Sequence, residues 1–334
     1  MNQLRMGWAA TAAAASLSCA PAMQAQGEQP STQQQPTSHA VALPVPTGTV
    51  HGTLLRPSPA ASMRTAAVII AGSGPTDRDG NSAVIAGDNN SLRQLAEALA
   101  EAGIASIRYD KRGIGESTSA AAAEADLRFQ HYVDDAAAWV ARLRESGDFD
   151  RILVIGHSEG ALIGTLAAQQ TPVDGLVLIA GMGRSMATTV RAQLAAQLPP
   201  EMMVQVDSML ATIAHGRTLD NVPPMLAPLF RPSVQPYLRS VMSIEPAAEL
   251  ARVQVPVLIV SGTTDLQVSI DNDARRLAAA APNARLVVIE GMNHILKHVD
   301  GSSIQQQLPS YGDPSLPLMP ELIRAVTEFA APPR

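Results

Sequence analysis

The sequence predicts an α/β protein in which a mostly parallel central sheet carries helices on both faces. Short apolar runs such as residues 66–71 (AAVIIA) are typical of strands that are buried on both faces. Longer segments with apolar residues at helical spacing alternate with these runs, which favours parallel strands joined by crossover helices. The 334 residues are 46% hydrophobic and 16% charged, enough for one large globular domain or two small ones.

The expected elements follow in chain order. Residues 39–46 and 49–56 are β-prone runs around Thr47-Gly48 and predict an opening hairpin. Ser91 to Gln94 have the form of a capping box, and apolar residues from Leu92 to Leu99 then share one face of a helix that stops at Gly103. Further strands are expected at residues 104–109, 152–155, 176–180, 257–260 and 286–289, and further helices at 129–145, 159–169, near 271–281 and near 320–330.

The alternation breaks at residues 182–250, which lack a strong strand run and hold seven of the 13 methionines. We expect a helical cap inserted into a core of residues 39–181 and 251–334. The methionines would either adapt to varied apolar ligands in a pocket or simply fill a helical core, and the sequence leaves both interpretations open.

The first residues are expected to lie outside the fold. Residues 1–25 combine an early positive charge, an apolar Ala-rich run and small residues, the pattern of a secretory signal peptide. A lipoprotein signal ending at Cys19 is less favoured because Ser16 stands where Leu is usual, and an ordinary Ala-rich helix is the other alternative. Residues 26–38 are expected to form a flexible linker. The hypothesis is therefore an exported protein, periplasmic or secreted by a bacterium.

Composition disfavours several classes. The net charge of −6 argues against a nucleic-acid partner. The single cysteine excludes a disulfide or thiolate metal site within the chain, and no second run is long enough to span a membrane. No phosphate-binding glycine motif follows a strand, so we expect neither a cofactor nor a metal, and the oligomeric state stays open.

The candidate chemistry lies at Gly156-His157-Ser158-Glu159-Gly160, a G-x-S-x-G motif between an apolar strand and a helix. A serine on such a sharp turn has strained backbone, and side chains two residues to either side would clash. Gly156 and Gly160 remove that clash, and the turn lifts the Ser158 hydroxyl above the sheet. The sequence therefore predicts Ser158 as a nucleophile.

A serine nucleophile needs a base and an orienting acid, which follow it in the chain order Ser, Asp or Glu, His. His294 follows the strand at 286–289 by a short loop, and Asp265 follows the strand at 257–260, so both face the same sheet edge. We predict Asp265 and His294 as the partners of Ser158. The less favoured candidates are His215, His298, Asp271, Asp273 and Glu290.

An oxyanion hole needs two backbone N–H groups. One is expected from Glu159, the residue after the nucleophile, and the other from the loop after the strand at 66–71, most simply Ser73. The nearby Asp77, Arg78 and Asp79 would either brace this loop or form a solvated turn, and residues 110–112 are expected to brace the elbow.

Five stretches resemble bacterial α/β-hydrolase carboxylesterases of the serine-aminopeptidase-like group: GSGPTDRDGN (72–81), YDKRGIGES (109–117), GHSEG (156–160), FRPSVQPYL (230–238), and SGTTDLQV (261–268) with EGMNH (290–294). The resemblance implies an α/β-hydrolase core with a helical cap, ester hydrolysis, and a triad of Ser158, Asp265 and His294. One departure is Ala71, since many relatives carry His before the oxyanion glycine.

The sequence thus predicts a serine hydrolase that cleaves small-molecule carboxylic esters of small to medium acyl chain through an acyl-enzyme. The first alternative is an aminopeptidase or prolyl-type peptidase with the same triad, in which Glu159 would hold the substrate α-amino group. The second is a secreted, non-catalytic binding protein on a hydrolase scaffold.

Overall fold

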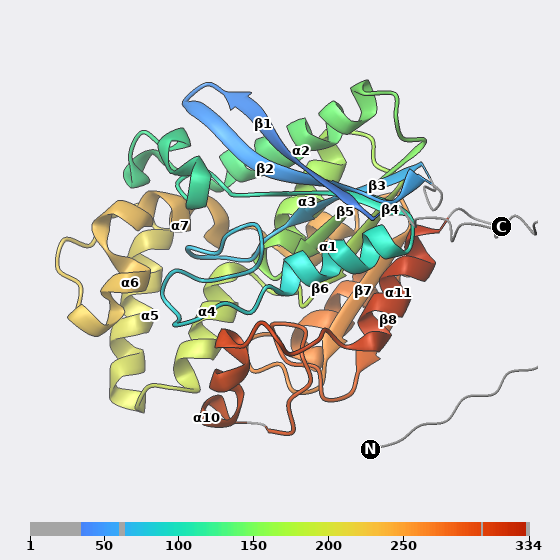
Figure 1. The fold of residues 1–334 in the computed structure, drawn as a ribbon. Coiled ribbons are helices and arrows are strands. Elements are labelled where there is room, and N and C mark those ends of the chain that lie inside the picture. The colour runs from blue at the N-terminus through green and yellow to red at the C-terminus, as the bar shows by residue number, and fades with distance from the viewer. Residues whose placement is uncertain (1–34, 60–63, 302, 332–334) are drawn as a thin grey trace, which may run out of the picture. The chain divides into compact units, whose positions relative to one another are not determined.

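The computed structural model describes residues 35–59, 64–301 and 303–331. Its central sheet has eight strands in the order β1-β2-β4-β3-β5-β6-β7-β8 (Figure 1). β1 pairs antiparallel with β2, and β2 pairs antiparallel with β4, whereas all other neighbours are parallel. The strands are β1 Thr37–Val45, β2 Gly48–Arg56, β3 Thr65–Ile70, β4 Ile104–Tyr109, β5 Arg151–His157, β6 Gly175–Ile179, β7 Val257–Gly262 and β8 Arg285–Ile289.

The central strands are buried because helices cover both faces of the sheet. β3 and β6 are apolar along nearly their whole length, β4 also contains Ser106 and Arg108, and every residue in the three strands is buried. One face packs against α1 (Ser91–Glu101) and α11 (Pro320–Ala330), and the other packs against α2 (Phe129–Glu145) and α3 (Glu159–Gln170). The predicted mostly parallel sheet with helices on both faces is confirmed.

Between β6 and β7 the chain forms helices and no strand. They are α4 Met186–Ala195, α5 Pro200–Ala214, α6 Ala227–Phe230, α7 Gln235–Met242 and α8 Pro246–Leu250. Met203, Met209 and Met242 are buried in the apolar cluster that α2 and α3 share, whereas Met225 is exposed. These three side chains pack into the core, as the core-filling interpretation expects.

The chain between β7 and the C-terminal helix is more irregular than the sequence predicts. A π-turn at Ile270–Ala274 precedes α9 (Arg275–Ala280), and a short helix α10 (Ile304–Gln307) follows β8, where no element was expected. The opening hairpin is present, but β1 begins at Thr37, two residues before the expected start. The proposed signal peptide at residues 1–25, with Cys19, lies outside the described residues, as does most of the linker at 26–38.

The predicted capping box at Ser91 is wrong. Asn90 is the N-cap of α1 and its side chain makes no cap hydrogen bond, whereas the Asn89 Oδ1 accepts the Ser91 N–H at 2.9 Å. The Asp79 carbonyl instead accepts the N–H groups of Leu92, at 3.0 Å, and Arg93, at 3.4 Å. The Asn89 side chain and a backbone carbonyl of the preceding loop therefore satisfy the first N–H groups of the helix, and the Ser91 side chain caps none of them.

Candidate active site

Ser158 lies on a strained turn between β5 and α3. Its backbone angles are φ 55° and ψ −120°, a conformation that side-chain-bearing residues rarely adopt. A Cβ added to Gly156 would lie 2.1 Å from the Gly160 carbonyl oxygen, and one added to Gly160 would lie 2.3 Å from the Ile70 carbonyl oxygen. Only glycine fits at either position, so the sequence Gly-His-Ser-Glu-Gly is what permits this turn.

The structure brings the three predicted side chains together. The His294 Nε2 lies 3.1 Å from the Ser158 Oγ, and the His294 Nδ1 lies 2.8 Å from Asp265 Oδ2. Because a carboxylate only accepts, the hydrogen-bond network assigns the imidazole proton to Nδ1 and leaves Nε2 to accept from the serine hydroxyl. The arrangement can therefore withdraw a proton from Ser158.

Asp265 is held in place by its own loop. Its Oδ1 accepts the backbone N–H groups of Gln267 at 2.7 Å and Val268 at 3.0 Å, and its side chain is fully buried. With Oδ1 occupied, only Oδ2 faces the imidazole. These contacts fix which carboxylate oxygen orients His294.

The competing candidates lie in other contacts. Asp273 is fully buried and forms an ion pair with Arg184 at 2.7 Å, and Asp271 pairs with Arg275 on the surface. His298 is exposed and pairs with Asp300. The His215 Nδ1 lies 2.7 Å from the Ala211 carbonyl oxygen of its own helix. Glu290 is exposed and has no ion pair among the described residues. None of these groups contacts Ser158 or His294 in the part of the chain that the structure describes.

His157, the residue before the serine, forms a hydrogen bond to the backbone of His294. Its Nε2–H donates to the His294 carbonyl at 2.8 Å, and the two rings lie 4.9 Å apart. Burial, together with the nearby His294 ring, lowers the pKa of His157 from 6.5 to about 4. His157 is therefore uncharged at neutral pH and places no positive charge beside the base. The sequence reasoning missed this role, because the motif leaves its second residue unspecified.

The backbone groups predicted for the oxyanion hole flank the serine. Glu159 is the first residue of α3, so its N–H has no partner within that helix. Gly72, immediately before Ser73, lies so close that an added Cβ would stand 3.2 Å from the Ser158 Cβ. The Ser73 N–H has no hydrogen-bond acceptor among residues 35–59, 64–301 and 303–331. Both N–H groups thus belong to segments next to Ser158 and have no hydrogen-bond acceptor in the described part of the chain.

The Glu159 carboxylate is buried and fully engaged. Its Oε1 accepts the Tyr237 hydroxyl of α7 at 2.6 Å, and its Oε2 lies 3.3 Å from the Lys111 Nζ. Lys111 is 1% exposed and also donates to the Gly72 carbonyl oxygen. The lysine lies 5.2 Å above the Tyr132 ring, a cation–π distance. This cluster links the elbow, the loop before Ser73 and a helix of the inserted segment.

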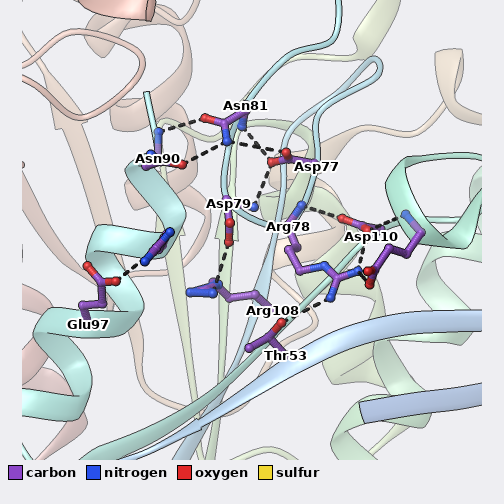
Figure 2. A network of polar contacts seen from close by, with 11 residues as sticks. Thr53, Asp77, Arg78, Asp79, Asn81, Asn90, Glu97, Arg108 and Asp110 are labelled. Atoms are coloured by element: carbon purple, nitrogen blue, oxygen red, sulfur yellow. Dashed lines mark hydrogen bonds and ion pairs between the residues drawn. The ribbon is translucent and has the colours of Figure 1, made fainter. Parts of the chain in front are cut away.

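The loop after Ser73 is braced rather than solvated, which resolves the two alternatives for its charges. Arg78 lies 2.7 Å from Asp110, and the Arg78 side chain is only 13% exposed. Asp79 lies 3.1 Å from Arg108 of β4. Figure 2 shows both pairs reaching from the loop to the sheet, with Asp77 turned toward Asn81 inside the loop.

Asp110, which directly follows β4, is the centre of that brace. It accepts the Arg78 backbone N–H at 2.8 Å and the Glu116 backbone N–H at 2.9 Å, in addition to the Arg78 guanidinium. A Cβ on Gly115 would lie 2.4 Å from its Oδ2, so the neighbouring loop also wraps this carboxylate tightly. The loop that carries Ser73 is therefore anchored to the core on its far side.

A hollow of about 780 Å³ adjoins the Asp265 loop. Leu266 and Gln267, which follow Asp265, lie in its wall together with Gln193 of α4, whereas Ser158, Asp265 and His294 themselves are not part of its lining. No charged side chain lines it, and its lining is Ile85, Gln193, Ala196, Gln197, Leu266, Gln267, Ser303, Ile304, Gln305, Gln307, Leu308 and Tyr311. Its size is that of a small-molecule site.

Two further properties concern the described residues only. They contain no cluster of three or more His, Cys, Asp or Glu side chains that could hold a metal ion. Across the same residues, no helix has the length and apolar character needed to cross a membrane.

Comparison with known proteins identifies the family. The family model described as "Serine aminopeptidase, S33" matches residues 87–298, more than half of the chain. The chain belongs to this family. The stretch that matches the S33 family contains Ser158, Asp265 and His294. It ends four residues after His294, in the loop that follows β8.

Individual proteins also resemble this chain. "Esterase EstD" of Thermotoga maritima is 26% identical over 261 residues, which are 78% of this chain and 61% of that protein. The chain thus spans about three fifths of the length of this curated relative. The solved structure of Est1E from Butyrivibrio proteoclasticus matches with a TM-score of 0.54 at 19% identity, covering 87% of this chain and 96% of that one.

A puromycin-hydrolyzing peptidase of Mycobacterium tuberculosis matches with a TM-score of 0.56 at 18% identity, covering 91% of this chain and 41% of that one. At these identities the solved structures show the fold alone. They establish the α/β-hydrolase fold that the sequence motifs predicted.

Proposed function

We propose that this protein is a serine esterase in which Ser158 is the nucleophile, His294 the general base and Asp265 the orienting acid. The observation that carries the proposal is the unbroken line of contacts from the Ser158 hydroxyl through His294 to Asp265, at 3.1 and 2.8 Å. Ser158 attacks the ester carbonyl while His294 takes its proton, and His294 then protonates the leaving alkoxide. In the second half of the reaction, His294 takes a proton from a water molecule, which attacks the acyl-enzyme carbonyl. His294 then returns that proton to the Ser158 oxygen as the carboxylic acid leaves.

The oxyanion that forms during this attack would be held by the Glu159 and Ser73 N–H groups. Ser158 precedes α3, so the positive end of that helix also faces the developing negative charge. The name of the Thermotoga relative, an esterase, supports an ester substrate for the present chain as well.

The contacts of Glu159 favour an ester over a peptide with a free α-amino group. An aminopeptidase needs a carboxylate that is free to bind a substrate ammonium group. Glu159 is 2% exposed, and its two oxygens already face Tyr237 and Lys111. The aminopeptidase alternative would therefore need a different carboxylate to bind the substrate ammonium group. The description of the family and the name of the mycobacterial peptidase are the reasons to test that alternative.

The hollow beside Asp265 supports uncharged substrates. Its side chains offer aliphatic surface and glutamine amides but no charge that would pair with an ionised acyl or alcohol group. We accordingly propose uncharged esters of small to medium acyl chain as the substrate class.

A fluorophosphonate probe distinguishes the enzyme from a non-catalytic binding protein. We expect the probe to label the wild-type chain and not Ser158→Ala. His294→Ala should lose about 10⁶-fold in turnover of a p-nitrophenyl ester. His298→Ala is the matched control, since that exposed ring pairs with Asp300 and forms no hydrogen bond with Ser158, Asp265 or His294, and it should retain turnover. Equal turnover by His294→Ala and wild type would refute the assignment of the base.

A substrate panel decides between ester and amide. We expect p-nitrophenyl esters of two to twelve acyl carbons to be cleaved, with a preference for the shorter half, and aminoacyl-p-nitroanilides to be turned over far more slowly. A preference for the anilides would establish the peptidase alternative.

We also propose that the chain is exported, on the basis of the signal-like pattern at residues 1–25. The test is the N-terminal sequence of the protein recovered from a Gram-negative host. We expect the mature chain in the periplasm or medium, beginning after Ala22 or Ala25. An uncleaved chain confined to the cytoplasm would contradict export.

A further inference from the structure

The position of Lys111 calls for an explanation, because an ammonium group is rarely buried this completely. The residue directly follows the Asp110 anchor after β4, is 1% exposed, and is one of two lysines in the chain. Removing such a charge from water is costly unless it is paired and hydrogen-bonded. Its partners are the Gly72 carbonyl oxygen and the Glu159 carboxylate, both from segments that flank Ser158.

The contact with Gly72 sets the direction of a neighbouring donor. The Gly72 carbonyl and the Ser73 N–H belong to the same planar peptide group, and the structure has no cis peptide bond among its described residues. In a trans peptide these two groups point in opposite directions. With the carbonyl turned toward the lysine, the Ser73 N–H is turned away from it, on the peptide that lies against Ser158.

The contact between Lys111 and the Glu159 side chain connects the lysine to the second oxyanion donor. The backbone N–H of Glu159 is the other expected oxyanion donor, and the side chain of the same residue lies 3.3 Å from the Lys111 ammonium. Lys111 therefore joins two segments that are separated by more than 80 residues. Ala71 has no hydrogen-bonding side chain with which to support the loop from within, so the support comes from across the sheet.

We propose that Lys111 is the positioning residue of the oxyanion hole: by holding the Gly72 carbonyl and the Glu159 carboxylate, it aims the Ser73 and Glu159 N–H groups at the substrate oxygen. The inference rests on the proposed esterase function and deepens it. The ammonium does not touch the substrate. It acts through the peptide group in front of it, whose dipole its charge also strengthens.

The experiment removes the lysine without leaving its partner as an unpaired buried charge. Lys111→Met combined with Glu159→Gln replaces both charges by neutral groups of similar size, and the Gln oxygen can still accept the Tyr237 hydroxyl. Lys111→Met alone is the second variant. The matched control is Arg112→Met with Asp135→Asn: Arg112 was expected to brace the elbow, but its guanidinium forms a buried ion pair with Asp135 of α2, at 2.6 Å, and makes no hydrogen bond to residues 156–160.

We expect kcat for a p-nitrophenyl ester to fall about 10- to 100-fold in both lysine variants, with KM within about threefold of wild type. The loss is below the 10²–10³-fold typical for deleting an oxyanion donor, because the N–H is retained but free to turn. The control should keep its kcat.

The deciding measurement is binding of a trifluoromethyl ketone, which Ser158 converts into a tetrahedral oxyanion, against the matching methyl ketone, which stays uncharged. Affinity for the trifluoromethyl ketone should fall by the same factor as kcat, whereas affinity for the methyl ketone should not change. A merely structural role would weaken both ligands together and lower the melting temperature.

Unchanged kcat and unchanged trifluoromethyl ketone affinity in a folded Lys111 variant would overturn the inference while leaving the esterase proposal intact. A parallel loss in the Arg112–Asp135 control would also overturn it, because any buried pair would then have the same effect. A wild-type chain that neither hydrolyses esters nor reacts with a fluorophosphonate would overturn the proposed function, and this inference with it.

Discussion

Acid should destabilise this protein through His157. The ring is 7% exposed and donates to the His294 carbonyl, and it faces the His294 ring, Asp265 and Lys111. Burial and the neighbouring imidazole lower its pKa from 6.5 to about 4, so the folded chain resists a proton that the unfolded chain accepts readily.

The sign and size of the effect follow from proton linkage. Stability rises with pH wherever the unfolded chain holds more protons, which for His157 is between pH 6.5 and about pH 4. The stability that a neutral His157 preserves is therefore fully present above pH 6.5 and is lost as the pH falls. Since one pKa unit corresponds to about 1.4 kcal/mol, we expect a loss of about 2 kcal/mol by pH 5 and about 3 kcal/mol in total.

The assay is urea unfolding followed by circular dichroism at pH 7 and pH 5. His157→Gln is the test variant, since its amide can donate to the same carbonyl but does not titrate. Between the two pH values, wild type should lose about 2 kcal/mol more than this variant. The comparison cancels other groups, including Asp79 and Asp135, whose pKa values burial raises.

His298→Gln is the matched control for this measurement. The His298 side chain is 59% exposed and pairs with Asp300 at the surface, away from the His294 ring, and the variant should follow wild type. If His157→Gln loses as much stability as wild type between pH 7 and pH 5, His157 does not resist protonation and the reasoning is refuted.

Three further outcomes are expected. Asp265→Asn should lower kcat about 10⁴-fold with little change in the melting temperature, because it disturbs the imidazole tautomer of His294. A loss below tenfold in steady-state kinetics would show that Asp265 does not orient the base. Gly160→Ala should destabilise the fold by at least about 2 kcal/mol in urea unfolding, since its Cβ would meet the Ile70 carbonyl oxygen at 2.3 Å, and a stability equal to wild type would contradict the clash. Asp110→Ala should cost about 3 kcal/mol by leaving buried donors unpaired, whereas Asp150→Ala, which removes the partner of an exposed pair, should barely shift the urea midpoint; equal shifts would show that burial does not matter here.

The parts of the site that the sequence predicts best are those with strong local requirements. Gly156 and Gly160 have no alternative at a turn this tight, and the motif that contains them is contiguous. Asp265 and His294 were predicted from chain order and from the rule that parallel strands end at one edge. The structure places both within hydrogen-bond reach in the expected line.

The parts that the sequence could not predict depend on contacts between distant segments. The side chain of Glu159 looked equally suited to a substrate ammonium group or to the helix N-terminus, and only the structure shows that its two oxygens face Lys111 and Tyr237. The start of α1 was mispredicted for a similar reason. Its N–H groups are met by the Asp79 carbonyl, and every residue type supplies a carbonyl, so no sequence pattern marks this contact.

The hydroxyl of Tyr237 has a practical consequence for exchanging parts among hydrolases. The segment between β6 and β7 looks like a module that could be swapped to alter selectivity, because Ser158, Asp265 and His294 all come from outside it. Yet Tyr237 reaches from that segment to the carboxylate of Glu159, the residue next to the nucleophile. A chimera that brings in a foreign segment should therefore carry a tyrosine at this place, or replace Glu159 and Lys111 by neutral residues in the same step.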